Sequence, residues 1–316
     1  MSTNETATRF FCLDRSFSTT STVTRDQPNI QDPPDAKFKS MLFMPRHPER
    51  KAEGGLRTQG YFKKSLPDKP LVTVITVVYN GVQYLEATIR SVIKQTHDNV
   101  EYVIIDGGSD DGSLDIIKKY NGQIDYWISE LDDGLYDAMN KGIRLSNGQI
   151  ICMLHSDDFY YDSDCLAAVV RNYINYQTFI VTDTIIKSES RQRLFACRST
   201  AHLYYEIPFM HPSSYIAKKI YYRYGLYDLQ YKIAADVDML MRLFVNKVKY
   251  ICLNKPTVVM RLGGLSDLNF VASRKEYRSI YLKYNNNVLM AYVGYFLSLS
   301  LRHLIEIKRR FKAIKV

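Results

Sequence analysis

The feature that most constrains the fold is a regular alternation, beginning at Leu71, of short apolar runs with amphipathic stretches. A short apolar run bounded by turn residues is typical of a buried strand, and apolar residues three and four positions apart are typical of a helix. Strands that alternate with helices build a mainly parallel sheet with helices on its faces. The sequence therefore predicts an α/β fold whose central, Rossmann-like sheet is mainly parallel and flanked by helices.

The apolar runs after Leu71 predict four strands, at Val72–Val78, Val100–Ile105, Ile124–Ile128 and Ile150–Leu154. Helical spacing between them predicts helices around Leu85–Ile93, Leu114–Ile117 and Leu135–Ile143. The pattern beyond Leu154 is mixed. It predicts a helix from Ser163, short strands near Phe179–Thr182 and Leu194–Cys197, and a helix at Ala235–Val245. We expect this smaller mixed region to belong to the same domain.

The segment before Leu71 has a different composition. It is rich in Ser and Thr at first, then contains several prolines and a Gly54-Gly55 pair, with little hydrophobic periodicity. This composition predicts an irregular N-terminal arm. We divide the chain into this arm at 1–70, a catalytic domain at 71–266 and a C-terminal helical, basic segment at 267–316.

Positive charge gathers at the C-terminus. The chain has a net charge of +9, and Leu301–Val316 contains six Lys or Arg residues and one Glu. The preceding Val288–Leu301 is uncharged and apolar, but its fourteen residues are fewer than the roughly 20 that span a bilayer. Two interpretations remain open: a helix on an anionic membrane surface, or a helix packed on the domain with a solvated basic end. Because the charges form a tail and not a stripe along the fold, we expect no nucleic-acid partner.

The cysteines and the first residues bear on the compartment. The five cysteines are scattered and form no CxxC pair, so we expect reduced thiols with no zinc or redox centre. The N-terminus lacks the basic-then-apolar order of a secretory signal. We expect a cytoplasmic protein, bound peripherally to the inner face of the plasma membrane through its C-terminal segment.

Acidic and polar residues follow three of the predicted strands, in Tyr79-Asn80-Gly81, in Asp106–Ser113 and in His155-Ser156-Asp157-Asp158. Ligands of open α/β sheets bind at the carboxyl ends of strands. Carboxylates gathered there repel one another unless a cation offsets them, so the pattern predicts Mg²⁺ or Mn²⁺ together with a diphosphate. Each loop alone has a simpler interpretation, because Asp-Gly and Gly-Ser form ordinary turns and the Ser-Asp-Asp run can cap a helix.

Several motifs in order resemble glycosyltransferase family 2, which has the GT-A fold. They are VTVITVVYNGVQYLEATIRSVIKQTHDNVEYVIIDGGSDDGSLDII, ISELDDGLYDAMNKGIRLSNGQII, HSDD, FMHPSSYIAKK, GLYDLQYKIAADVDMLMRL and GGLS, which together span Leu71 to Ser266. The GLYDAMNKGI run resembles bacterial transferases that assemble O-antigen, capsule or exopolysaccharide. The resemblance implies inverting transfer of a sugar from a nucleotide-sugar donor, usually a UDP-sugar, to a hydroxyl of a saccharide or lipid-diphosphate-linked acceptor.

The resemblance also implies donor-site roles. The backbone around Val77 and Tyr79 would lie along the base, and Asp106 would accept hydrogen bonds from the base or ribose. Asp157 would bind the ribose or the metal shell, and Asp158 the metal. A bound metal offsets the negative charge that grows on a departing nucleoside diphosphate. The loop and helix at Asp133–Lys141 would border the donor, with Lys141 or Asn140 reaching it, or else forming an exposed helix face. His155 replaces the Asn more usual before Ser-Asp-Asp.

The base of an inverting transferase takes the proton of the acceptor hydroxyl. The resemblance implies Asp236 for this role, although Ala235 replaces the usual Glu. Asp238 is the runner-up. Residues two apart point to different sides of a helix. We therefore expect one aspartate to face the site and the other to cap the helix or to pair with Arg242. Both could instead complement the helix dipole. His211 would orient the acceptor, or serve only as a structural hydrogen-bonding residue.

Two other functions compete with glycosyl transfer. A nucleotidyltransferase would attack a nucleoside triphosphate, but the residues after the first strand, Tyr79–Val82, lack the Lys or Arg expected of its phosphate-binding loop. A non-catalytic sugar-nucleotide-binding scaffold would be expected to lose site carboxylates. All of these are present: Asp106, Asp157, Asp158 and Asp236.

Overall fold

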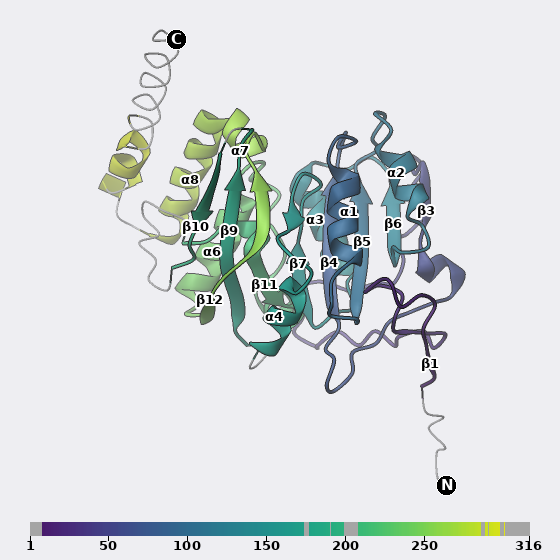
Figure 1. Cartoon of the computed structure of the whole chain (residues 1–316). Coiled ribbons are helices and arrows are strands. Elements are labelled where there is room, and N and C mark those ends of the chain that lie inside the picture. Colours follow the sequence, from purple (N-terminus) through teal and green to yellow (C-terminus); the bar gives the residue numbers. More distant parts are fainter. Residues whose placement is uncertain are drawn as a thin grey trace.

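One ten-stranded sheet organises the protein (Figure 1). The computed structural model describes residues 8–173, 177–189, 191–198, 208–285, 288–289, 291–297 and 300. The strand order is β3-β6-β5-β4-β7-β11-β9-β12-β8, and β10 pairs with β9. The predicted basic tail at 301–316 lies outside the described residues.

The half of the sheet that follows the N-terminal arm is parallel, as predicted. Its strands are β4 (Val72–Val78), β5 (Val100–Asp106), β6 (Tyr126–Ser129) and β7 (Ile150–Met153), with β4 paired to both β5 and β7. β6 begins later than expected, because the carbonyls of Ile124 and Asp125 accept hydrogen bonds from Leu56 and Arg57 of the arm. The carboxyl ends of β4, β5 and β7 therefore lie at one edge of the sheet.

The other half is mixed. It contains β8 (Phe159–Tyr160), β9 (Phe179–Lys187), β10 (Gln192–Phe195), β11 (Ser214–Ala217) and β12 (Tyr250–Arg261). β11 runs antiparallel to β7 and β9, and β12 runs parallel to β9. The sequence did not predict β11 or β12. Pro256 interrupts the pattern of β12, since a proline argues against an interior strand, but it sits where the ladder shifts register.

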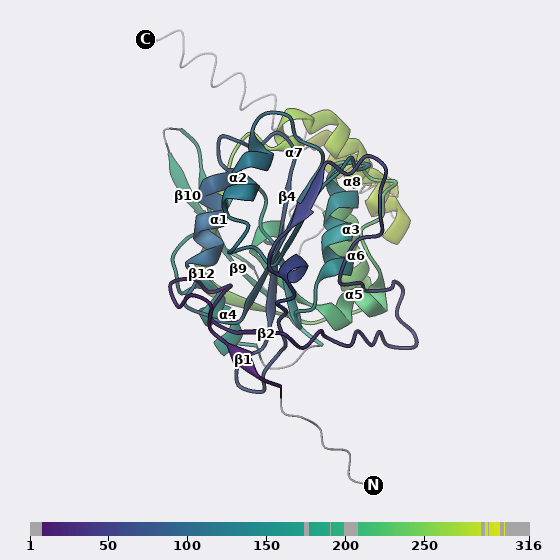
Figure 2. The same ribbon diagram turned by 90° about the vertical axis from the view of Figure 1, so that its right-hand side faces the viewer.

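Helices cover both faces of the sheet (Figure 2). One face carries α1 (Leu85–Ile93), α2 (Ser113–Lys119) and α4 (Cys165–Arg171); the other carries α3 (Leu135–Leu145), α5 (Lys218–Tyr224), α6 (Ala235–Val245) and α8 (Phe270–Tyr284), which follows the short α7 (Leu265–Leu268). Successive β4 side chains alternate between two cores: Val74 packs toward α1 and α4, whereas Ile75 packs toward α3 and α6. This arrangement confirms the predicted α/β fold.

The N-terminal arm lies against the sheet. Its strand β3 (Ala52–Gly54) pairs antiparallel with β6, while β1 (Phe10–Phe11) and β2 (Val23–Thr24) form a small separate ribbon. Arg57 in the 3-10 helix η1 (Leu56–Gln59) is 2% exposed and forms a 2.7 Å ion pair with Glu101 of β5. A buried ion pair thus joins the arm to the parallel sheet.

The C-terminal region contributes α8, which packs against α6. Within the ranges that the structure describes, no helix is both long enough and apolar enough to cross a bilayer.

Candidate functional site

The loops that follow β4 and β5 are joined by hydrogen bonds. The Asn80 N–H donates to Ser109 Oγ at 2.8 Å, and the Asp110 N–H donates to Asn80 Oδ1 at 3.0 Å. Asn80 has a φ of 50°, in the left-handed region that asparagine tolerates better than most residues. The two loops expected to bind the nucleotide therefore form one unit at the carboxyl edge of the sheet.

Asp106 ends β5 and is fully buried. Its carboxylate accepts a 3.1 Å hydrogen bond from the Ser109 N–H, one from the Ser109 hydroxyl and a 2.6 Å bond from the Ser129 hydroxyl. A carboxylate with several donors is held in one orientation. Of the other nucleotide residues, Val77 has its side chain in the core, whereas the Tyr79 side chain is 68% exposed.

Asp132 is an acidic neighbour of the β5 loop that the sequence analysis did not single out. A Cβ on Gly107 would lie 2.7 Å from Asp132 Oδ2, so the carboxylate occupies the space that a larger residue would need. Burial raises the pKa of Asp132, and the charges of Asp137 and Asp106 add to this effect. The run Asp132-Asp133-Gly134 was visible in the sequence, but not which aspartate would turn inward.

The two aspartates after β7 differ in exposure. Asp157 is half-buried, whereas Asp158 is 2% exposed and accepts a 3.2 Å hydrogen bond from the Arg261 N–H. Burial raises the pKa of Asp158 well above its usual range, and the charge of Asp157 raises it further. Asp157 is thus the more accessible of the pair.

Arg261, at the end of β12, is a second residue that sequence reasoning missed. Its guanidinium donates to the carbonyl of Asp157 and lies 4.3 Å from the ring centroid of Tyr84 and 4.7 Å from that of Phe159. These contacts place a permanent positive charge beside the two aspartates. The contact joins residues about a hundred positions apart, so no local pattern signals it.

Two histidines stack beside Asp157. The rings of His155 and His211 are 5.9 Å apart, and His211 Nε2 is 2.7 Å from the Tyr227 hydroxyl. Burial, and to a smaller extent the proximity of His155, lower the pKa of His211 to about 3. Burial also lowers the pKa of His155, against the charge of Asp157. Both imidazoles are therefore neutral near pH 7.

Asp236 lies in the first turn of α6 and is half-buried. Its Oδ1 accepts 2.9 Å hydrogen bonds from the Tyr136 hydroxyl and the Val237 N–H. Burial raises the pKa of Asp236, and these hydrogen bonds oppose that effect in part. A carboxylate with a raised pKa is better suited to accept a proton near neutral pH.

Asp238 has a different environment. It is fully buried and binds Arg242, Lys283 at 2.8 Å and the Tyr284 hydroxyl at 2.9 Å. Its carboxylate therefore joins α6 to α8.

Lys141 and Asn140 of α3 make internal contacts. Lys141 Nζ lies 3.2 Å from Glu130 Oε1 and 3.3 Å from Asp137 Oδ2. The Asn140 side chain exchanges two 2.9 Å hydrogen bonds with the backbone of Tyr227, which places that tyrosine beside His211. Asn140 thus positions other residues of the site.

Comparison with known proteins identifies the family. The sequence profile described as Glycosyl transferase family 2 matches residues 73–235, which is more than half of the chain. The chain belongs to glycosyltransferase family 2. The matched segment contains every predicted donor-site residue and ends next to Asp236.

Curated proteins similar to this chain are also named glycosyltransferases. A PGL/p-HBAD biosynthesis glycosyltransferase of Mycobacterium tuberculosis is 28% identical over 181 residues, covering 56% of this chain and 71% of the relative. An uncharacterized glycosyltransferase of Rickettsia typhi is 37% identical over 92 residues, covering 29% of each chain.

Two solved structures share the fold of this transferase. S. aureus TarS 1–349 in complex with UDP-GlcNAc has a TM-score of 0.54 at 15% identity, covering 70% of this chain and 69% of that chain. The mannosyltransferase PcManGT from Pyrobaculum calidifontis, in complex with GDP-Man and Mn²⁺, has a TM-score of 0.56 at 15% identity, covering 78% and 80%. These similarities confirm the predicted GT-A fold.

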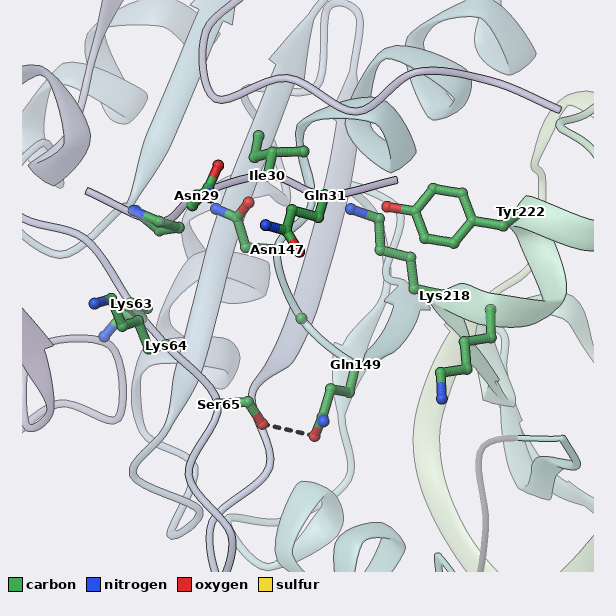
Figure 3. A pocket seen from close by; sticks show the side chains of 13 residues that line it. Asn29, Ile30, Gln31, Lys63, Lys64, Ser65, Asn147, Gln149, Lys218 and Tyr222 are labelled. Atoms are coloured by element: carbon green, nitrogen blue, oxygen red, sulfur yellow. Dashed lines mark hydrogen bonds between the residues drawn. The ribbon is translucent and has the colours of Figure 1, made fainter. Parts of the chain in front are cut away.

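A cavity of about 470 Å³ lies elsewhere in the glycosyltransferase (Figure 3). It is lined by the arm, the start of α5 and the turn Asn147–Gln149 before β7, at the edge of the sheet opposite Asp157. Lys63 and Lys218 line it, but their amino groups donate to the carbonyls of Thr19 and Ser146. We assign this cavity to the packing of the arm against the sheet.

Proposed function

We propose that this family 2 glycosyltransferase is an inverting enzyme that transfers a sugar from a UDP-sugar to a hydroxyl of a lipid-diphosphate-linked saccharide during surface polysaccharide synthesis. Asp236 is the base. The observation that carries the proposal is the Tyr136–Asp236 hydrogen bond, because it links the carboxyl end of the sheet, where the proposed donor loops lie, to a half-buried carboxylate with a raised pKa.

The link can be followed through the chain. Asp106 lies next to Gly107, which contacts Asp132, and Asp132 begins the turn that leads into α3. Tyr136 stands in the first turn of α3 and donates to Asp236. A donor bound along Asp106 would therefore lie at the same, carboxyl end of the sheet as the base.

The reaction follows from these positions. The acceptor hydroxyl gives its proton to an oxygen of Asp236 as the hydroxyl oxygen attacks the anomeric carbon from the face opposite the diphosphate. The bond from that carbon to the diphosphate breaks, and a nucleoside diphosphate leaves. Arg261 supplies fixed positive charge near the leaving group.

A divalent metal fits this site. Among the described residues no group of three or more His, Cys, Asp or Glu side chains is placed so that it could hold a metal ion by itself. Mg²⁺ and related ions bind transferred phosphates through only one or two carboxylates, with the substrate completing the shell. Asp157 and Asp158 match that mode, and a bound metal would stabilise the negative charge of the diphosphate.

Burial supports Asp157 as the metal-facing carboxylate, in place of the Asp158 that the resemblance implies. Asp157→Asn is expected to raise the Mn²⁺ concentration for half-maximal turnover more than 100-fold, because a direct ligand is lost. The amide of Asp158→Asn can still accept the hydrogen bond from the Arg261 N–H. This variant should raise the Mn²⁺ concentration for half-maximal turnover only about 10-fold to 100-fold. The check is a Mn²⁺ titration of nucleoside diphosphate release. A larger effect of Asp158→Asn than of Asp157→Asn would indicate that Asp158 is the direct metal ligand.

The experiment that tests the function measures nucleoside diphosphate release from a panel of nucleotide sugars, with and without Mn²⁺ and with lipid-linked acceptor extracts. Metal-dependent turnover of one donor is the expected result. Diphosphate release from a nucleoside triphosphate would indicate a nucleotidyltransferase instead. Donor binding without turnover under any condition would indicate a scaffold protein.

We also propose that the C-terminal segment places the enzyme on the membrane surface that holds the acceptor. Leu289 and Phe296 support this, because their side chains are 73% and 58% exposed in a stretch without charged residues. Flotation of the full chain with vesicles tests it. Binding to vesicles containing anionic lipid but not to neutral ones is expected, and equal recovery without vesicles would contradict it.

A further inference from the structure

Glu276 of α8 binds the segment that leads into α6. Its Oε1 accepts a 2.9 Å hydrogen bond from the Lys232 N–H, and its Oε2 accepts 2.9 Å bonds from the N–H groups of Ile233 and Ala234. Ala234 is the N-cap of α6. Hydrogen bonds from amides to a carboxylate are stronger than those to neutral acceptors, and a negative charge is favoured at a helix N-terminus. Glu276 therefore holds three consecutive residues in place.

The held segment shares a partner with the base. The Tyr136 hydroxyl lies 2.9 Å from both the carbonyl of Ile233 and Oδ1 of Asp236. Asp236 follows Ala234 by two positions, within the first turn of α6. A shift of the segment that Glu276 holds would move Asp236 and its hydrogen bond together.

We propose that Glu276 is a positioning residue for the base Asp236, and that α8, which lies outside the segment matched to the family, belongs to the catalytic machinery. The inference rests on the proposed role of Asp236.

The charges around Asp236 support this role. Tyr136 binds Asp236 from α3. Three further groups interact with Asp236 electrostatically: Tyr227 from the segment before α6, and Glu276 and Tyr277 from α8. Burial raises the pKa of each of these three phenols, so they are neutral near pH 7. Glu276 instead carries negative charge and contributes, after burial, to the raised pKa of Asp236.

The charge and the geometry can be separated with two variants in the full chain. Glu276→Gln keeps the size of the side chain and removes its charge. We expect kcat to fall about 10-fold to 100-fold, because displacements of about 1 Å have effects of this size, with donor KM within twofold of wild type. The acid limb of the kcat profile should move to lower pH, because removing a nearby negative charge lowers the pKa of a carboxylate that must be ionised to act.

Glu276→Asp keeps the charge but draws the carboxylate back by one methylene. It should lower kcat while leaving the acid limb close to its wild-type position. Lys275→Ala, at the exposed neighbouring position of α8, is the matched control and should change neither. Donor affinity, measured by calorimetry, reports whether each variant is folded.

The outcomes distinguish this inference from the proposed function. Wild-type kcat and an unmoved acid limb in Glu276→Gln, with Asp236→Asn inactive, would overturn the role of Glu276 alone. An equal loss of donor binding and kcat in both Glu276 variants would also overturn it, since that indicates a general structural effect. Full activity of Asp236→Asn would overturn the base itself.

Discussion

Replacing Asp236 with Asn is expected to lower kcat with a lipid-linked acceptor by about 100-fold to 10,000-fold, the usual contribution of a general base. The amide can still accept from Tyr136 and Val237, so the first turn of α6 should stay folded. It cannot take the acceptor proton. Donor affinity should stay within about twofold of wild type, because the residues that we propose bind the donor lie mainly at the ends of β4, β5 and β7 and in the loops that follow. Steady-state product formation and donor calorimetry on the same preparation check both statements.

The pH profile adds a second measurement to this prediction. The proposed base acts only when ionised, so kcat should fall as the pH drops through the pKa of Asp236, which burial raises above the usual aspartate value. The acid limb should therefore lie above the value for an exposed aspartate and should disappear in the residual activity of Asp236→Asn.

Asp238→Asn is the matched comparison for Asp236→Asn. Asp238 is paired with Arg242 and Lys283, so its replacement leaves these cations without their carboxylate, and the main expected loss is thermal stability. If Asp238→Asn were inactive but as stable as wild type, while Asp236→Asn stayed active, the two aspartates would exchange roles.

Replacing Arg57 with Ala is expected to lower the free energy of unfolding by about 3–5 kcal/mol, the usual cost of leaving one partner of a buried ion pair alone. The side chains of Arg57 and Glu101 are each 1% exposed, and Arg57 also donates to the carbonyls of Leu42 and Leu145. Its loss would leave these carbonyls without a partner and would detach the arm from β5.

Urea unfolding followed by fluorescence measures this loss, because the single tryptophan, Trp127, is buried on β6 next to β3. Lys69→Ala is the control. Its ion pair with Asp98 is 2.9 Å long, against 2.7 Å for the Arg57 pair, but both of its side chains are about 40% exposed, so we expect a change of less than about 1 kcal/mol. Similar small losses in both variants would show that the arm contributes little to stability.

The sequence determined the parallel half of the sheet and the loops in which we propose that the donor binds. Both are local: β4 and β5 are mainly apolar runs, Asp106 ends β5, and Asp157 and Asp158 lie in the loop that follows β7. It did not predict β12, whose pairing with β9 tolerates Pro256 only because the ladder changes register there. The pairing of a strand with its neighbours can offset an unfavourable residue such as Pro256, and the hydrophobic pattern of the sequence contains no information about that pairing.

The tertiary structure alone decided which carboxylates are accessible and which are enclosed. Asp236 and Asp238 stand two positions apart, yet Lys283 and Tyr284, more than forty residues later, bind Asp238 and not Asp236. Two further contacts likewise depend on where β12 and α8 pack. One is the contact of Arg261 with the Asp157 carbonyl, and the other is the contact of Glu276 with the backbone that leads to Asp236. Burial and pairing are properties of side chains that meet across the fold, and they set the charge and orientation of each group. The sequence therefore determined which residue types follow the strands, and the packing of distant elements decided the burial and the partners of each side chain.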